Sequence, residues 1–122
     1  MVLYENNDTI AFLDIFPISQ GHAIVIPKLH YTNLETIPIK ILYAVMESVK
    51  IVSNLIYKNL GVNGYNIMQN NFKAAGQVIN HFHVHIIPRS IKDEKIKVLI
   101  PREQATEGEL RKTLKIIKGT SY

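Results

Sequence analysis

The sequence of 122 residues contains no cysteine. That absence excludes a disulfide framework, a thiolate zinc site and a thiol nucleophile. The sequence also has no apolar run of membrane-spanning length and no signal-peptide pattern at its start, so we expect no membrane partner and no secretion. We therefore predict a cytoplasmic location.

The charge balance is mildly basic and unevenly distributed. Lys and Arg number 14 and Asp and Glu number 10, which gives a formal net charge of +4. Nine of the basic residues lie between Arg89 and Lys118, where five of the ten acidic residues also lie. This segment has no arginine-rich run and no aromatic residues among its basic ones, so we expect a solvated surface and no nucleic-acid partner.

Length and composition fit a single domain over residues 1–122. Hydrophobic residues make up 47% of the chain and charged residues 20%, which is ordinary for a globular protein with one core. Alternating apolar positions and turn residues predict strands over Val2–Glu5, Thr9–Ile15, Ala23–Ile26 and Gly64–Gln69. A short edge strand is also expected over Lys97–Ile100.

Apolar residues at helical spacing predict a long helix from Pro38 to Asn59 that ends at Gly61. Capping-box patterns predict a short helix after Thr32 and a final helix between Thr106 and Gly119. Strands and helices in this order predict an α+β domain in which the helices pack against an antiparallel sheet.

One segment, His81-Phe82-His83-Val84-His85, differs from this ordinary background. Its apolar flanks predict a strand closed by Pro88, and strand geometry places the three histidines on one face and the apolar residues on the other. Imidazole titrates near neutral pH and can act as nucleophile, proton carrier or metal ligand. Three imidazoles on one face therefore predict a reactive site.

Two kinds of chemistry fit three neighbouring imidazoles. They can hold a metal ion with an open position, or one can attack a substrate covalently while the others hold phosphate oxygens. The preceding loop supplies the neutral donors Asn70 and Gln77, and Gly76 lets the backbone approach a ligand closely. No carboxylate lies within seven residues of His83 to support a metal ligand. These neighbours favour the nucleophile, and the metal site stays open.

The segment His81–Ile87 has the form His-φ-His-φ-His-φ-φ, where φ is apolar. With this segment the sequence resembles the histidine triad family of nucleotide hydrolases. Three other blocks match that family in order and spacing: Asp14–Pro17, Gly21–Lys28, and Asn70 followed by Ala75-Gly76-Gln77. The resemblance extends from about Tyr4 to Arg89.

The resemblance implies a five-stranded antiparallel sheet with two main helices, a homodimer, and hydrolysis at the α-phosphate of a nucleotide without a required cofactor. It implies that His83 is the nucleophile that forms a nucleotidyl-histidine, and that the backbone carbonyl of His81 orients its ring. The other implied roles are phosphate or proton contacts (His85, His22), phosphate binding (Asn70, Gly76, Gln77), ribose binding (Asp14) and base binding (Ile15, Phe12).

Some positions keep other roles open. Phe12 also fits simple core packing, and Asp14 fits the cap of the turn before Pro17. His30 fits a packing role beside the site. Arg89 is a candidate contact to a distal phosphate and equally a candidate for simple solvation.

The substrate is narrowed by further comparison with the family. His85 stands where branches that transfer nucleotides carry Gln, which implies a hydrolase, and Ile87-Pro88-Arg89 resembles prokaryotic members. The leaving group is open between the amine of a nucleoside phosphoramidate and the second nucleotide of a dinucleoside polyphosphate. An aliphatic pocket favours a purine, because the larger ring buries more apolar surface.

Two other functions stay open. One is a metal-dependent hydrolase that uses His81, His83 and His85 as ligands. This chain lacks the Cys-x-x-Cys start that many members carry, so their cysteine zinc site is excluded. The other function is a nucleotide-binding regulatory module in which turnover is incidental.

Overall fold

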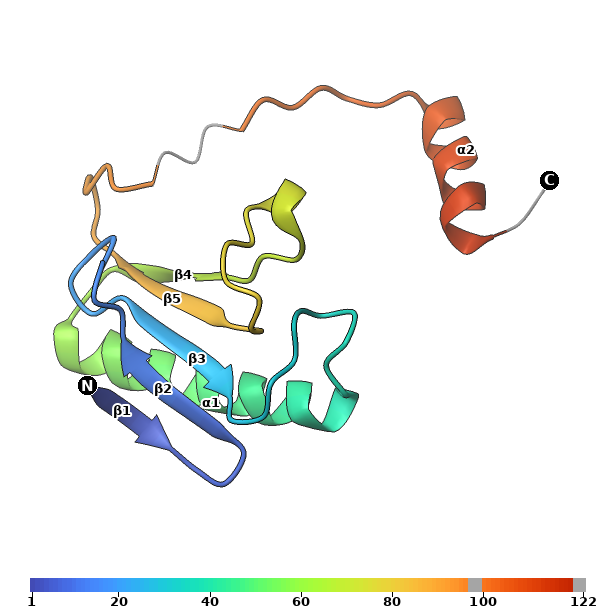
Figure 1. Ribbon diagram of the computed structural model, residues 1–122. Coiled ribbons are helices and arrows are strands. Elements are labelled where there is room, and N and C mark those ends of the chain that lie inside the picture. The colour runs from blue at the N-terminus through green and yellow to red at the C-terminus, as the bar shows by residue number, and fades with distance from the viewer. Residues whose placement is uncertain (97–99, 120–122) are drawn as a thin grey trace.

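The computed structural model describes residues 1–96 and 100–119. Five strands form one antiparallel sheet in the order β1-β2-β3-β5-β4 (Figure 1). The strands are Val2–Glu5 (β1), Thr9–Leu13 (β2), Ala23–Pro27 (β3), Gly64–Met68 (β4) and Val84–Arg89 (β5). The α+β fold with a five-stranded antiparallel sheet and two helices is therefore confirmed.

The first two strands form a hairpin whose turn is held by one side chain. Asn6 Oδ1 accepts the backbone N–H groups of Asp8 and Thr9 at 3.0 and 2.8 Å. The hydroxyl of Thr9 lies 2.6 Å from that of Ser48, and both residues are buried. This polar contact fixes the start of β2 against the long helix.

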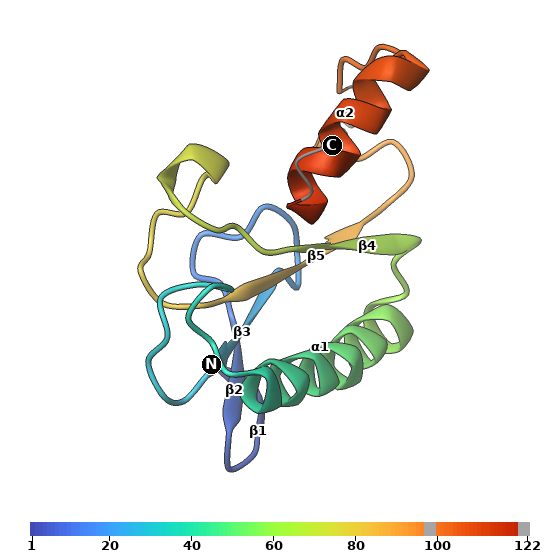
Figure 2. The same cartoon turned by 90° about the vertical axis from the view of Figure 1, so that its right-hand side faces the viewer.

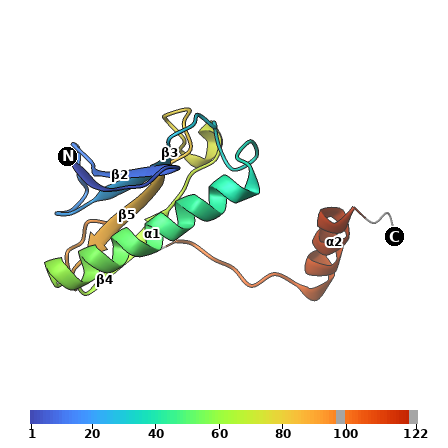
Figure 3. The same cartoon turned by 90° about the horizontal axis from the view of Figure 1, so that it is seen from below.

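The long helix α1 covers Ile39–Leu60 and packs against one face of the sheet (Figures 1 and 3). It begins after Pro38, whose fixed backbone suits a helix start, and ends at Gly61, whose φ of 64° is left-handed. Val45, Val49 and Val52 form its buried stripe at the predicted spacing. Each such buried side chain stabilises the fold by about 1.5–3 kcal/mol. The opposite face of the sheet is left open for a site.

The histidine segment enters the sheet later than predicted. We expected a strand through all three histidines, but β5 begins at Val84, where its pairing with Val25 of β3 starts. The preceding segment leaves the sheet pattern because the N–H of Phe82 donates to the carbonyl oxygen of Tyr31. The alternation still holds, since Phe82 and Val84 are buried while the histidines are half-buried. Pro88 does not close the strand; it lies inside β5.

Two other boundaries differ from the prediction. β2 ends at Leu13 instead of Ile15, because Asp14 Oδ1 accepts the N–H of Phe16 and turns the chain. The short helix expected after Thr32 is wrong. Thr36 Oγ1 accepts the N–H groups of Thr32 and Asn33, so these residues form turns in place of a helix.

The final helix α2, Glu107–Lys118, has the predicted capping box at Thr106 but does not pack against the sheet. It contacts no other helix or strand among the described residues, and Figures 1 and 3 both place it at the end of an extended segment, away from the sheet. The expectation that every helix packs on the sheet is therefore wrong for α2. The edge strand expected at 97–100 falls largely outside the described residues. Within the described part of the chain, neither helix is long and apolar enough to cross a membrane.

Candidate active site

A cleft of about 1020 Å³ lies on the face of the sheet opposite α1. His81, His83 and His85 line one part of it. Apart from the carboxylate of Asp14, the rest of the lining is apolar: Met1, Val2, Phe12, Leu13, Ile15, Phe16, Ile24, Ile26, Val78 and Ile79. A concave apolar site with a few convergent polar groups is typical of small-molecule binding.

One backbone contact determines which nitrogen of the His83 ring carries the proton. Its Nδ1 lies 2.7 Å from the carbonyl oxygen of His81. A carbonyl can only accept, so Nδ1 carries the proton and donates. The lone pair of neutral His83 is therefore on Nε2, which suits nucleophilic attack.

A second histidine pair lies beside this ring. The backbone N–H of Ile18 donates to His22 Nδ1 at 3.0 Å, so neutral His22 carries its proton on Nε2. That nitrogen lies 2.9 Å from His85 Nδ1, which must then accept. The proton of His85 is left on Nε2. The His83 and His85 rings lie 4.9 Å apart between centroids, so a bare nitrogen and an N–H donor occur side by side.

Burial keeps this second pair neutral. It lowers the pKa of His22, and the nearby carboxylate of Asp14 opposes that change. Burial also lowers the pKa of His85, and the neighbouring His83 and His22 lower it further against the effect of Asp14. Both rings therefore favour the neutral form, which agrees with the assignment of their protons.

Asp14 takes part in the turn and also faces the histidine pair. Its Oδ1 accepts the N–H of Phe16 at 2.8 Å, which is the turn-capping role that the sequence left open. Its Oδ2 lies 3.6 Å from His22 Nε2. Its carboxylate is also among the groups that line the cleft.

Asp14, His22 and His85 offer ligand atoms within 4.8 Å of one another, which is close enough for a metal ion. The fit is nevertheless poor. A metal on His22 Nε2 would move its proton to Nδ1, which already faces the N–H of Ile18. These three groups therefore suit hydrogen bonding better than metal coordination. They also differ from His81, His83 and His85, the metal ligands that the sequence left open.

His81 pairs with the remaining histidine. Its Nε2 lies 3.0 Å from the carbonyl oxygen of Pro27, and its Nδ1 lies 3.2 Å from Nδ1 of His30. The two rings meet edge to face with centroids 5.0 Å apart. His30 is thus joined to the site by a hydrogen bond as well as by packing.

Three residues of the loop before β5 lie outside the cleft. None of Asn70, Gly76 and Gln77 is among the described residues that line it. Gly76 has a φ of 92° and ends the single 3₁₀ turn η1, Lys73–Ala75, which lies apart from α1 in Figures 1 and 2.

The amide of Gln77 is engaged within the protein. It donates to the carbonyl oxygens of Thr32 and Ile79 at 2.6 and 3.1 Å, and its oxygen accepts the N–H of Phe72 at 2.8 Å. In this structure Gln77 holds the loop together. Phosphate contacts from Asn70, Gly76 and Gln77 stay predictions.

Both predicted base-binding residues line the cleft. Phe12 is half-buried on the cleft face of β2, and Ile15 is 83% exposed beside it. The prediction missed Ile24 and Ile26, which share that face of β3. Ile24 and Ile26 alternate with the buried Ala23 and Val25, so β3 is apolar on both faces. A strand of this kind is usually covered on both faces, and this pattern could have indicated a binding surface on the face opposite α1.

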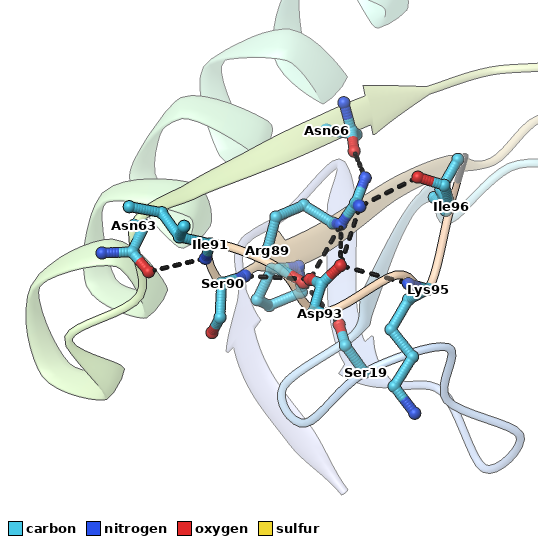
Figure 4. A network of polar contacts seen from close by, with 10 residues as sticks. Ser19, Asn63, Asn66, Arg89, Ser90, Ile91, Asp93, Lys95 and Ile96 are labelled. Atoms are coloured by element: carbon cyan, nitrogen blue, oxygen red, sulfur yellow. Dashed lines mark hydrogen bonds and ion pairs between the residues drawn. The ribbon is translucent and has the colours of Figure 1, made fainter. Parts of the chain in front are cut away.

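Arg89 is tied down at the far end of β5 (Figure 4). Its guanidinium pairs with Asp93 at 2.8 Å, donates to Asn66 Oδ1 at 2.8 Å, and donates to the carbonyl oxygen of Ile96 at 3.0 Å. This hydrogen bond from Arg89 holds the pKa of Asp93 well below its usual range. The guanidinium of Arg89 is therefore engaged in holding the segment that follows β5.

Comparison with known proteins gives one consistent result. The family model for the HIT domain matches residues 1–92. Adenylylsulfatase HINT3 of Arabidopsis thaliana is 46% identical over 91 residues, which cover 75% of this chain and 46% of that protein. Adenosine 5'-monophosphoramidase HNT1 of Saccharomyces cerevisiae is 38% identical over 98 residues, which cover 80% of this chain and 58% of that protein. The chain thus spans about half the length of these two relatives.

A solved structure agrees over almost the whole chain. The crystal structure of a HIT family protein from Bacillus anthracis superimposes with a TM-score of 0.89 at 30% sequence identity. The match covers 97% of this chain and 85% of that one. The fold therefore matches over nearly all of the sequence, beyond the residues that the family model covers.

Proposed function

Because the chain belongs to the histidine triad (HIT) family, we propose that it hydrolyses a nucleotide at the α-phosphate through a covalent intermediate on His83. One observation carries this proposal. The unprotonated Nε2 of His83 and the N–H donor of His85 lie side by side in a large apolar cleft. A nucleophile and a donor for developing negative charge are what phosphoryl transfer needs.

The first step follows from the assigned protons. His83 Nε2 attacks the α-phosphorus and a new N–P bond forms. The bond from phosphorus to the leaving group breaks, and the leaving group keeps the electron pair and takes up a proton. The His83 ring becomes positively charged, and its Nδ1–H bond to the carbonyl of His81 strengthens because it is now charge-assisted. The Nε2–H of His85 stabilises the negative charge on the leaving atom or on a phosphate oxygen.

In the second step, water attacks the same phosphorus. The N–P bond breaks, its electron pair returns to His83 Nε2, and a nucleoside monophosphate leaves. The proton that the water loses replaces the one that the leaving group took up in the first step. The carboxylate of Asp14 lies 3.6 Å from His22 Nε2. Its negative charge stabilises an additional proton on the His22–His85 pair during the cycle.

The cleft supports a purine nucleotide as substrate. Phe12 and Ile15 offer apolar contact to a flat base, and the carboxylate of Asp14 can accept hydrogen bonds from ribose hydroxyls. Asn70, Gly76 and Gln77 complete the proposed substrate contacts, although reaching a phosphate would require their loop to move. Two relatives are named for adenylyl substrates, so we favour an adenosine phosphoramidate or adenylyl sulfate over a dinucleoside polyphosphate.

We also propose that the protein is a cytoplasmic homodimer that requires no cofactor. The position of β4 at one edge of the sheet supports the dimer, because an edge strand has unpaired backbone groups that a second copy can bind. Tyr65 of β4 is 40% exposed and stacks edge to face on Tyr57 of α1, which is 47% exposed, so β4 and the end of α1 present a joined aromatic surface.

An experiment with two substrates tests the function. The protein is incubated with adenosine phosphoramidate or diadenosine tetraphosphate, and release of AMP is followed with and without excess chelator. We expect AMP from at least one substrate in both conditions, and none from His83→Ala with its circular dichroism unchanged. Activity that disappears with chelator would favour a metal-dependent hydrolase. Binding of AMP without turnover of either substrate would favour the regulatory module.

A further inference from the structure

We propose that His30 is a positioning residue for the nucleophile, acting through the side chain and backbone of His81. This inference rests on the proposed function, because it concerns how His83 is held for attack. His30 is not among the described residues that line the cleft. The proposal therefore gives a role in the reaction to a histidine outside the cleft.

Both ring nitrogens of His81 are held by the segment Pro27–Tyr31. The carbonyl oxygen of Pro27 can only accept, so His81 Nε2 carries the proton and donates at 3.0 Å. The lone pair of neutral His81 is then on Nδ1, and His30 Nδ1, 3.2 Å away, must be the donor. The ring of His81 is therefore fixed in one tautomer and one orientation.

The peptide group after His81 is held by the same segment. The backbone N–H of Phe82 donates to the carbonyl oxygen of Tyr31, the residue after His30, at 2.6 Å. The carbonyl of that peptide is the group that accepts His83 Nδ1–H at 2.7 Å. A peptide that donates at one end is a stronger acceptor at the other, because hydrogen bonds in a chain polarise one another.

The sheet itself does not supply this orientation. β5 begins only at Val84, and the pairing of β3 with β5 ends at Val25. The peptide that orients the nucleophile thus precedes the ladder of sheet hydrogen bonds. Its position depends on three contacts from Pro27–Tyr31, and the one made by a side chain comes from His30.

Loss of the His30 donor should loosen the nucleophile and leave substrate binding intact. Without that donor, the His81 ring and its peptide are free to shift, and His83 is less firmly held with its lone pair on Nε2. Misplacement of a reacting group lowers the rate of chemistry far more than it changes the affinity of distant contacts. His30 is exposed, so its replacement leaves the buried core unchanged.

The kinetic test uses three variants with adenosine phosphoramidate as substrate. His30→Ala should lower kcat by about ten- to a hundredfold with KM nearly unchanged. His30→Asn should restore most of kcat, because its amide nitrogen can occupy the position of Nδ1 and donate. Leu29→Ala, at a neighbouring side chain that is 65% exposed, is the matched control and should keep kcat. An unchanged kcat in His30→Ala would overturn the proposal.

A spectroscopic test does not depend on turnover. In protein labelled with ¹⁵N-histidine, His81 should have its proton on Nε2, and the Nδ1 proton of His83 should be slow to exchange. His30→Ala should give a mixture of His81 tautomers and faster exchange at His83, and His30→Asn should restore the wild-type spectrum. If both signals survive in His30→Ala, the positioning role is wrong. If they change as expected in a protein that turns over no nucleotide, the proposed function fails and the role of His30 in holding His83 stands.

Discussion

At the scale of single residues, backbone atoms place the protons of two imidazoles in the site. The N–H of Ile18 places the proton of His22, and the carbonyl of His81 places the proton of His83. The sequence predicted which histidines share a face, because side-chain direction alternates along an extended chain. The family resemblance implied the contact from the carbonyl of His81. Residue type could not predict the contact from the N–H of Ile18, because nearly every residue has such an N–H.

The lowered pKa values of His22 and His85 predict a loss of stability in acid. Burial lowers both from the ordinary histidine value of 6.5, so below that pH the unfolded chain binds protons that the folded chain does not. The free energy of unfolding should therefore fall as the pH drops below about 6.5 and should not depend on these rings well above it.

Urea unfolding followed across this pH range measures the effect. His22→Asn is the matched variant, because its side-chain oxygen can accept the N–H of Ile18 but does not titrate. Its stability should depend less on pH than that of the wild type. A wild-type stability that rises on acidification below pH 6.5 would mean that these rings are stabilised in the charged form, against the direction given by their burial.

At the scale of elements, Gly21 fixes the turn that delivers His22 into β3. Its φ is 87°, and a Cβ there would meet Leu60 Cδ1 at the end of α1. Gly21→Ala should therefore lower the free energy of unfolding by roughly 1–3 kcal/mol. Gly61→Ala is the control for backbone strain alone, since Gly61 has a φ of 64° and no atom near its absent Cβ. Equal costs for the two variants in thermal unfolding would contradict the predicted clash.

The network around Arg89 belongs to the same scale, because it ties the segment after β5 to the sheet. Arg89→Ala should leave kcat for adenosine phosphoramidate unchanged, since the guanidinium is engaged by Asp93, Asn66 and the Ile96 carbonyl. It should speed hydrogen exchange at the N–H of Ser90 and Lys95, which Asp93 accepts. A large loss of kcat in this variant would instead support the distal-phosphate contact.

Element boundaries show how far local patterns predict structure. The long helix was predicted almost to the residue, because its apolar spacing, Pro38 and Gly61 agree. The pattern Thr32-x-x-Glu35 predicted a helix that does not form. The two N–H groups that its capping box would use are taken by other side chains, because Thr36 Oγ1 accepts the N–H of Thr32 and Asn33 Oδ1 accepts the N–H of Glu35. Competing hydroxyls in a short segment decide such cases, and a pattern of residue types does not rank them.

At the scale of the whole molecule, the position of α2 was beyond the sequence. Its capping box predicted the helix itself, but α2 contacts no described helix or strand of its own chain. Its apolar side chains Leu110, Leu114 and Ile117 are at least half exposed. Helical periodicity indicates that a face is apolar, but it does not identify the surface that covers that face.

The proposed homodimer gives a prediction at this scale. Sedimentation of the wild-type protein should give the mass of two chains. Tyr65→Lys, which places a charge on the edge strand β4, should shift the protein toward one chain. Ile91→Lys is a matched control at a residue that is 75% exposed outside the strands, and it should stay dimeric. A wild-type mass of one chain would contradict the dimer.

The central claim, covalent catalysis by His83, is tested most directly by locating the intermediate. The protein is mixed with adenosine phosphoramidate, quenched in alkali within the first turnover, digested, and sequenced by tandem mass spectrometry. We predict an adenylate on His83 in the wild type and no such adduct in His83→Gly. An adenylate on His85 or on His22, or steady AMP release with no labelled histidine in rapidly quenched samples, would contradict it.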